Sequence, residues 1–247
     1  MSVPTHTSSL FAYHSFPVNS HRTDLPLQSL QTNPQGVVCL PSRAHDARRA
    51  YDRLKRIFDV CGCLCLLPLA LPLMLGCAVA VWTEDRGPVL FRQQRTGKYG
   101  RRFAMYKFRT MKTNAEELKL KYAHLNQLSW PDFKIANDPR VTRVGRFLRK
   151  TSLDELPQLV NVLLGDMSLV GPRPTSFGVD TYGLHHTERL EVVPGVTGLW
   201  QISGRSDLEF DERLRLDVEY IEKRSLWLDV RILLGTVTAI IRPRGAY

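Results

Sequence analysis

The sequence predicts a mostly helical α+β protein of monotopic membrane architecture, attached to the membrane by a proline-broken, re-entrant helix. Residues 60–83 form a charge-free run of about 24 residues, longer than the ~20 that a helix needs to cross a bilayer. Pro68 and Pro72 lie in its middle, where each removes a backbone donor and favours a kink or a break. Basic residues flank both ends, as they do on the cytoplasmic side of membrane proteins. A helix that enters, breaks and returns satisfies both observations, and an ordinary kinked span is the alternative.

The chain divides into three predicted parts. Residues 1–50 are rich in Ser, Thr, Pro, Asn and His without apolar periodicity, so we expect a disordered polar tail. Residues 51–84 are the membrane helix-break-helix, and residues 85–247 form the remaining domain. The basic flanks comprise five Lys and Arg residues within 48–56 and six within 86–102.

The charge balance indicates anionic partners. Lys and Arg number 34 against 24 Asp and Glu, which gives a net charge of +10. Nucleic acid, anionic lipid and phosphorylated substrates all fit such a charge. Four of the five cysteines lie inside the apolar run, and they are not at metal-ligand spacing, so we interpret them as reduced apolar side chains. The histidines form no ligand cluster either, which argues against zinc.

A hairpin and a helix are expected after the membrane segment. Two extended runs, 88–95 and 101–111, are separated by a loop that contains glycine, a pattern typical of a β-hairpin. Lys107 and Arg109 would project from the same face of the second strand. Residues 115–128 have the periodicity of an amphipathic helix.

Three further segments are amphipathic. Residues 137–150 carry basic side chains opposite an apolar side, which is either a solvated basic face or a contact with phosphate or a membrane surface. Residues 208–225 and 226–241 are predicted helices. Their apolar stripes fit core packing, and they also fit docking at the membrane interface.

Residues 151–174 carry the most specific pattern. Ser152 and Glu155 have the spacing of a capping box, and Pro157 is tolerated in a first helical turn. The pattern therefore predicts a helix that begins near Asp154. Leu156, Leu159, Val160 and Leu163 would form its buried stripe.

Asp154 and Glu155 can do more than complement a helix dipole, although dipole complementation alone is the simpler interpretation. Helix N-termini also bind phosphates, and two carboxylates beside an anionic substrate need cations to offset the repulsion. Mg²⁺ bridging carboxylate and diphosphate oxygens is one solution. Arg149 and Arg173 can grip phosphate oxygens with a planar fork. A carboxylate there can attack phosphorus and form an acyl phosphate, which a second acceptor then attacks.

With these motifs in order, the chain resembles the bacterial sugar transferases, the monotopic phosphoglycosyl transferases, over about residues 52–247. The resemblance rests on KRIFDV, the proline-broken apolar run, FRQQRTG, KFRTM, DPRVTRVGRFLRKTSLDELPQLVNVLLGDMSLVGPRP, PGVTGLWQISGR and RGAY. It implies a compact cytoplasmic catalytic domain in which Asp154 is the nucleophile and Glu155 helps to hold Mg²⁺. By the same matching, the phosphates of a UDP-sugar would be lined by Lys107, Arg109, Arg149, Arg173 and Arg205.

The reaction that the resemblance implies transfers hexose 1-phosphate from a UDP-hexose to undecaprenyl phosphate and releases UMP. It would take place at the cytoplasmic face of the bacterial inner membrane and begin a repeat unit of exopolysaccharide, capsule or O-antigen. The expected partners are the two substrates, inner-membrane lipid, a second copy of the chain and downstream glycosyltransferases, but not nucleic acid. Glucose and galactose are both plausible sugars.

Two other classes of function fit parts of the sequence. A membrane-anchored nucleic-acid binder explains the charge of +10 but leaves the Asp154–Glu155 pair and the broken apolar run unexplained. A non-catalytic scaffold in polysaccharide assembly could have an identical sequence, and only activity distinguishes it from the enzyme.

Overall fold

The structure is a computed structural model, and it describes residues 31–32, 38–39, 45–122, 124, 126, 135, 137–176, 184–203 and 210–241. Most of the predicted tail therefore lies outside the described residues. Its described part comprises the antiparallel strands β1 (Gln31–Thr32) and β2 (Val38–Cys39) and the start of helix α1. The mostly helical α+β prediction is confirmed.

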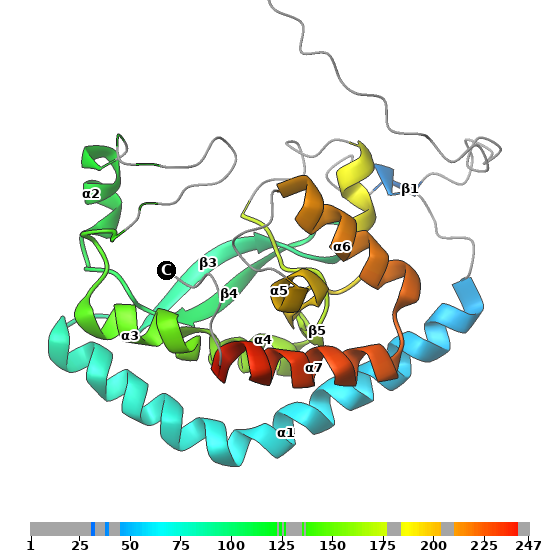
Figure 1. Cartoon of the computed structure of the whole chain (residues 1–247), viewed down its shortest axis with the longest axis horizontal. Coiled ribbons are helices and arrows are strands. Elements are labelled where there is room, and N and C mark those ends of the chain that lie inside the picture. The colour runs from blue at the N-terminus through cyan, green and yellow to red at the C-terminus, as the bar shows by residue number, and fades with distance from the viewer. Residues whose placement is uncertain are drawn as a thin grey trace, which may run out of the picture.

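Helix α1 (His45–Glu84) is 40 residues long, contains Pro68 and Pro72, and is assigned without interruption through both. Figure 1 shows it bending along the lower edge of the molecule, beneath α3, α4 and α7 in this view. Proline is an identifiable cause of such a bend, because its ring removes a hydrogen bond and crowds the preceding turn. The structure thus shows a bent helix, and the side of a membrane on which its ends lie stays a prediction.

Within the described residues, α1 is the one helix whose length and composition would allow it to cross a membrane. Within the candidate segment, Ala50–Glu84, the most apolar window of 18 residues has a mean hydropathy of 2.4, and only 17% of that window is buried. The core helix of a soluble protein would be mostly buried. The low burial leaves most of this apolar surface facing outward.

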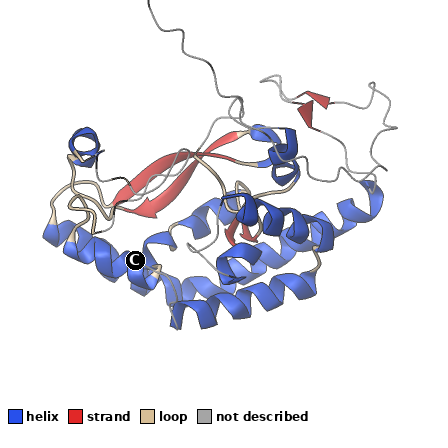
Figure 2. Ribbon diagram, turned by 45° about the horizontal axis from the view of Figure 1, so that its top comes forward, coloured by secondary structure: helices blue, strands red, loops and turns tan. Residues whose placement is uncertain are grey.

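The predicted hairpin is confirmed. Strands β3 (Leu90–Thr96) and β4 (Arg102–Phe108) pair antiparallel, from Leu90 opposite Phe108 to Thr96 opposite Arg102. The 3₁₀ turn η3 (Lys98–Gly100) joins them. Figure 2 shows the two strands as a ribbon beside the helical part of the molecule. The first half of the helix predicted over 115–128 is seen as α2 (Ala115–Lys121), and residues 123, 125, 127 and 128 lie outside the described residues.

The predicted helix start near Asp154 is wrong. Helix α3 (Arg143–Thr151) is capped by Ser152, which has a left-handed backbone (φ 58°). The Ser152 amide closes the helix by donating to the carbonyls of Arg149 and Leu148. A single 3₁₀ turn, η5 (Leu153–Glu155), follows, and α4 (Gln158–Leu164) begins after it. The Ser152 side chain makes no capping bond, so the capping box does not form. Asp154 and Glu155 lie in a tight turn between two helices.

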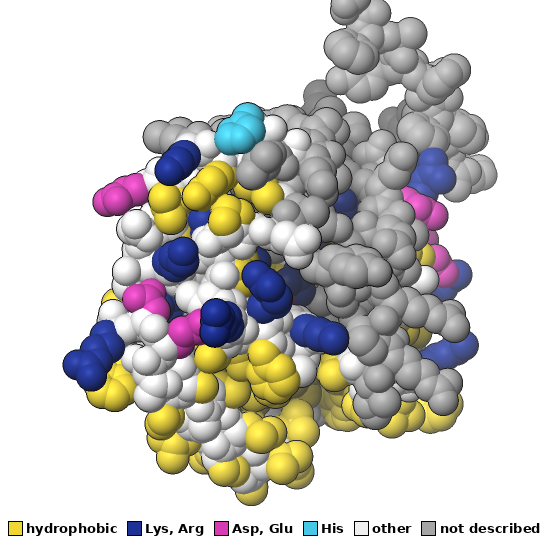
Figure 3. Space-filling view, turned by 60° about the vertical axis from the view of Figure 1, so that its left-hand side comes forward, with side chains coloured by type: hydrophobic (Ala, Val, Ile, Leu, Met, Phe, Trp, Pro, Cys, Tyr) yellow, Lys and Arg dark blue, Asp and Glu magenta, His cyan; other side chains and the backbone are white. Residues whose placement is uncertain are grey.

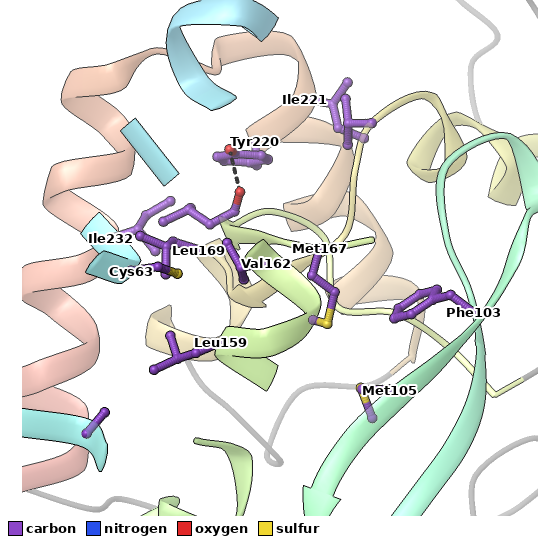
Figure 4. Packing of buried hydrophobic residues seen from close by; sticks show 13 residues of the cluster. Cys63, Phe103, Met105, Leu159, Val162, Met167, Leu169, Tyr220, Ile221 and Ile232 are labelled. Carbon is purple, nitrogen blue, oxygen red and sulfur yellow. Dashed lines mark hydrogen bonds between the residues drawn. The ribbon is translucent and has the colours of Figure 1, made fainter. Parts of the chain in front are cut away.

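The remaining elements form a small parallel sheet with helices around it. Strands β5 (Ser168–Val170) and β6 (Gly195–Thr197) pair in parallel. The helical elements are η7 (Leu184–Glu191), α5 (Leu199–Ser203), α6 (Phe210–Lys223) and α7 (Leu226–Ile241). Figure 4 shows Cys63 of α1, Leu169 of β5 and Ile232 of α7 beside one another in the core. Cys61, Cys63, Cys65 and Cys77 are free thiols.

A buried polar network fixes the first part of α1 to the rest of the domain. The Lys55 ammonium lies 3.2 Å from the Asp59 carboxylate and 3.1 Å from Asp229 of α7. Tyr51 and Tyr220 both donate hydrogen bonds to Asp229, at 3.0 and 2.8 Å. A cation removed from water needs this degree of pairing. The network sets where the helix enters the domain.

Restoring a straight α1 tests the re-entrant prediction. Each proline disfavours a continuous helix by about 3 kcal/mol relative to alanine. We expect the wild-type N-terminus to be cytoplasmic, and we expect the double variant Pro68→Ala/Pro72→Ala to place at least part of its N-termini on the periplasmic side. Protease access to an N-terminal epitope in inside-out and right-side-out vesicles measures this. A wild-type epitope cleaved in right-side-out vesicles would show that α1 spans.

Candidate active site

Glu155 lies between two cations that come from distant parts of the chain. The Lys107 ammonium of β4 contacts its Oε1 at 2.9 Å. The Arg173 guanidinium, from the loop after β5, donates to Oε1 at 2.5 Å and to Oε2 at 3.4 Å. The hairpin, the η5 turn and the Pro172–Arg173–Pro174 loop therefore converge on one carboxylate.

Asp154, next along the chain, has a different environment. It is 9% exposed, and no described side chain hydrogen-bonds to its carboxylate. Burial, followed by the neighbouring negative charge of Glu155, raises the pKa of Asp154, while Lys107, Arg149 and Arg173 oppose the rise. Three positive side chains thus face two carboxylates, which leaves the site with a net positive charge, and Asp154 has no hydrogen bond from a described side chain.

The environment shifts the pKa values of the two carboxyl groups in opposite directions. Burial alone would raise the pKa of Glu155, but Arg173 and Lys107 outweigh burial and hold it well below its usual range. The pKa of Asp154 shifts in the opposite direction, upward. Neighbouring carboxyl groups whose pKa values are pushed apart commonly have different roles in a mechanism. Glu155 is held as the fixed anion of the site, whereas Asp154 binds a proton more readily.

Arg149 reaches the site from the last turn of α3. Its Nε donates to the hydroxyl of Thr110 at 2.9 Å, just beyond the end of β4. The Thr110 carbonyl accepts a hydrogen bond from the backbone of Thr142 at 3.1 Å, and Gly145 packs directly against it. Helix α3 therefore docks on the strand end that carries Lys107. That docking sets where Arg149 points.

Of the predicted phosphate ligands, Arg109 is not brought to the pair. Arg109 turns to Asp85, after α1, where it donates to the backbone carbonyl and lies 3.7 Å from the carboxylate. Lys107 and Arg109, which were expected to share a face, thus pair with different carboxylates: Lys107 with Glu155 and Arg109 with Asp85. Arg205 lies outside the described residues. A phosphate contact by either arginine stays a prediction.

Sequence reasoning missed several polar side chains that build the site. Asn161 of α4 donates to the Ala104 carbonyl at 2.7 Å and accepts from the Tyr106 backbone at 3.0 Å, so it fixes β4 beside Lys107. Glu84, the last residue of α1, accepts from the backbone of Arg143 and Val144, both at 2.7 Å, and caps α3. A lone Asn within an apolar stripe was the available signal for Asn161. No local pattern indicated Glu84.

The donor set for a metal is small. Among the described residues, no three or more Asp, Glu, His or Cys side chains are grouped to hold a metal ion. Mg²⁺ commonly takes one or two carboxylates and completes its shell with substrate phosphates and water. Asp154 and Glu155 fit this donor type. Because Glu155 already accepts from Lys107 and Arg173, these two cations would share its carboxylate with a bound Mg²⁺.

Comparison with known proteins decides the family. The family described as "Bacterial sugar transferase" matches residues 50–243, which include the whole described site. The chain belongs to the bacterial sugar transferase family. One member, the undecaprenyl-phosphate galactose phosphotransferase of Salmonella typhimurium, is 47% identical over 206 residues, which is 81% of this chain and 43% of the relative.

The chain matches a larger share of the length of two further relatives. The exopolysaccharide production protein ExoY of Rhizobium meliloti is 38% identical over 84% of this chain and 94% of the relative. The UDP-glucose:undecaprenyl-phosphate glucose-1-phosphate transferase of Caulobacter vibrioides is 42% identical over 81% of this chain and 74% of the relative. The chain spans less than half the length of the Salmonella relative and nearly all of ExoY.

Gly145→Ala tests the docking of α3. An alanine Cβ would collide with the carbonyl carbon and oxygen of Thr110, and backbone cannot move aside as a flexible side chain can. Forced overpacking costs about 1–3 kcal/mol, so we expect a lower unfolding temperature and a weaker enzyme. Thermal unfolding in detergent measures it. Gly76→Ala is the matched control, since nothing lies within 4 Å of its Cβ. Equal stability of the two variants would refute close packing at Gly145.

Proposed function

We propose that this chain transfers hexose 1-phosphate from a UDP-hexose to undecaprenyl phosphate and releases UMP. The observation that carries the proposal is the Asp154–Glu155 pair among Lys107, Arg149 and Arg173 in a member of the sugar transferase family. The names of the Salmonella and Caulobacter relatives state the polyprenyl acceptor, with galactose in one and glucose in the other. The product would begin a polysaccharide repeat unit.

The proposed reaction has two steps at one phosphorus. An Asp154 carboxylate oxygen attacks the β-phosphorus of the UDP-hexose, the bond from that phosphorus to the bridging oxygen breaks, and UMP leaves with the electron pair. A phosphate oxygen of undecaprenyl phosphate then attacks the same phosphorus, and the bond to Asp154 breaks. This gives undecaprenyl diphosphate hexose and restores the carboxylate. No redox change or net proton transfer is needed.

The cations of the site would serve the diphosphate. Arg173 and Arg149 offer planar guanidinium groups that can grip phosphate oxygens at two points, and Lys107 adds a point charge. The charge that develops on the leaving UMP would be stabilised by groups already in place, which is the most effective form of electrostatic catalysis. We propose Glu155 as a ligand for Mg²⁺, whose chemistry when bound is to neutralise diphosphate oxygens.

The apolar surface supports a membrane location. On α7, Trp227 is 75% exposed and Leu234 is 65% exposed. More than a third of the side chain is also exposed at Leu64, Leu66, Leu69, Leu71, Leu73 and Leu75 of α1. Soluble monomers rarely expose so much apolar surface in one region. In Figure 3, apolar side chains gather along the lower part of the face, with Lys and Arg above them, as suits anionic headgroups.

We therefore infer that the chain sits at the cytoplasmic face of the bacterial inner membrane, with α1 re-entering on the same side. The acceptor phosphate lies at the headgroup level, while the UDP-sugar is cytosolic. A site at the interface meets both. The bend of α1 and its two prolines support this arrangement.

The deciding experiment supplies protein held in nanodiscs with Mg²⁺, undecaprenyl phosphate and a panel of UDP-sugars, and it measures UMP. Because the relatives are named for galactose and for glucose, both donors are included beside N-acetylated ones. Release of UMP with one hexose donor identifies the sugar. If none of the donors yields UMP, the proposed function is wrong and the scaffold hypothesis replaces it.

Asp154→Asn is expected to abolish transfer. The amide is nearly isosteric but cannot act as an anionic nucleophile, so activity should fall by about 10³-fold or more with the unfolding temperature unchanged. The intermediate is measured as radiolabelled sugar phosphate bound to protein without acceptor. Asp166→Asn, at a partly exposed aspartate 4.0 Å from Arg101, is the matched control. Labelling of Asp154→Asn at the wild-type level would exclude Asp154 as the nucleophile.

The pH dependence of the first step is expected to report Asp154. Since its pKa is raised, the nucleophilic carboxylate is lost as pH falls through a value above that of an ordinary aspartate. In Glu155→Gln the neighbouring negative charge disappears, and Lys107 and Arg173 then act on Asp154 alone. The acid limb should therefore move to lower pH.

UMP release in a single turnover without acceptor measures this acid limb, because the lipid phosphate is then absent from the titration. Saturating Mg²⁺ removes weakened metal binding as a cause. An acid limb at the same pH in the wild type and in Glu155→Gln would contradict the coupling of the two carboxylates.

A further inference from the structure

Arg173 occupies a loop whose backbone is held at nearly every residue. The Gly171 amide donates to the Thr197 carbonyl at 2.9 Å, and the Pro172 carbonyl accepts from Gly195 at 2.9 Å. Thr175 accepts from the Thr96 amide at 3.0 Å. Each of these bonds joins backbone to backbone.

The Arg173 carbonyl is held differently, by a side chain. Arg189 of η7 donates to it from Nη2 at 2.7 Å. The same Nη2 donates to Oδ2 of Asp217, on α6, at 2.6 Å. Because an Nη group has two hydrogens, it can make both bonds at once. A line of contacts thus runs from Asp217 through Arg189 to the backbone of Arg173, whose guanidinium binds Glu155.

The Asp217–Arg189 pair is buried, with Asp217 1% exposed and Arg189 8% exposed. Desolvating two charges costs several kcal/mol per ion in general, so such a pair often adds little stability over apolar side chains of the same volume. Within the described part of the chain, the one backbone group to which it hydrogen-bonds is the Arg173 carbonyl. Its geometry therefore serves the position of that residue.

We propose that Asp217 and Arg189 are positioning residues that hold Arg173 in place for the substrate diphosphate. The inference rests on the proposed function, because it takes Arg173 to be a phosphate ligand. The flanking prolines fix φ at 172 and 174, and Pro174 also restricts Arg173 to extended backbone. The bond from Arg189 anchors the carbonyl, so the direction of the Arg173 side chain is set from behind the site.

A double-mutant cycle tests the line of contacts from Asp217 through Arg189 to Arg173, which we call the relay. Asp217→Asn and Arg189→Lys are each made alone and in an Arg173→Lys background, and kcat/KM for the UDP-hexose is measured. Each single variant should lose about 10- to 100-fold, as expected of a misplaced catalytic group. In the Arg173→Lys background the further loss should shrink to within about twofold, because the relay acts only through the fork of Arg173.

Glu219→Gln, on the same helix and in an exposed pair with Lys223, is the matched control and should leave kcat/KM unchanged. Equal fold-losses in both backgrounds would overturn the relay, since a general structural defect multiplies any activity. If Asp217→Asn fails to fold, Arg189→Lys, which keeps the charge opposite Asp217, completes the cycle by itself.

Calorimetric affinity for UDP, measured on the same proteins, separates this inference from the proposed function. If UDP binds and the cycle is non-additive in Kd but no donor yields UMP, the relay stands and the proposed function falls. If UMP is released and the losses are equal in both backgrounds, the proposed function stands and the relay falls.

Discussion

The arrangement of the domain depends on Glu155 finding two cations in a place with little water. A carboxylate taken out of solvent is costly unless it is paired and hydrogen-bonded, and removing one partner leaves the others uncompensated. Lys107 can reach Glu155 only if the β3–β4 hairpin lies against η5, and Arg173 can reach it only if the loop after β5 closes over the same turn. One ion triad thus fixes three segments that are far apart in the sequence. Asp154 lies in the electrostatic field of the same cations, but no described side chain hydrogen-bonds to it.

This constraint explains why part of the site could be predicted and part could not. The adjacent carboxylates and the arginine between two prolines are chemical patterns, and the structure brings Asp154, Glu155, Lys107, Arg149 and Arg173 into one electrostatic group. The capping box at Ser152 failed because local spacing contains no information on distant cations. The Glu155 carboxylate pairs with Lys107 and Arg173, and Ser152 adopts the left-handed conformation that ends α3. Tertiary pairing outweighed the local signal.

The same distinction holds for the fold. The hairpin was predictable, because alternating extended runs around a glycine-containing loop describe a local structure. The apolar run predicted α1 and its prolines predicted a distortion, yet sequence alone could not distinguish a bend from a complete break. That outcome depends on whether neighbours such as α3, α4 and the Lys55–Asp229 network hold the two halves. Asn161, Arg189 and Asp217 were missed for a related reason. The local sequence does not indicate their partners. Asn161 bonds to the β4 backbone, Arg189 to the Arg173 carbonyl and Asp217 to the Arg189 side chain, and these partners are distant in sequence.

The end of α1 joins this long apolar helix to the elements that carry the cations around Asp154 and Glu155. Glu84 caps α3 through two backbone amides, while Asp85 contacts Arg109 and accepts from the Thr113 backbone at 3.0 Å. One corner of two residues therefore holds both the start of the helix that carries Arg149 and the chain just beyond β4, which carries Lys107. A rigid-body shift of α1 would displace both cations relative to Asp154, because short polar contacts tolerate little change in distance. At the proposed membrane location, the depth of α1 in the bilayer and the geometry at the acidic pair are consequently coupled through this corner. The proposed reaction draws one substrate from lipid and one from water, which is a physical reason for a site beside this corner.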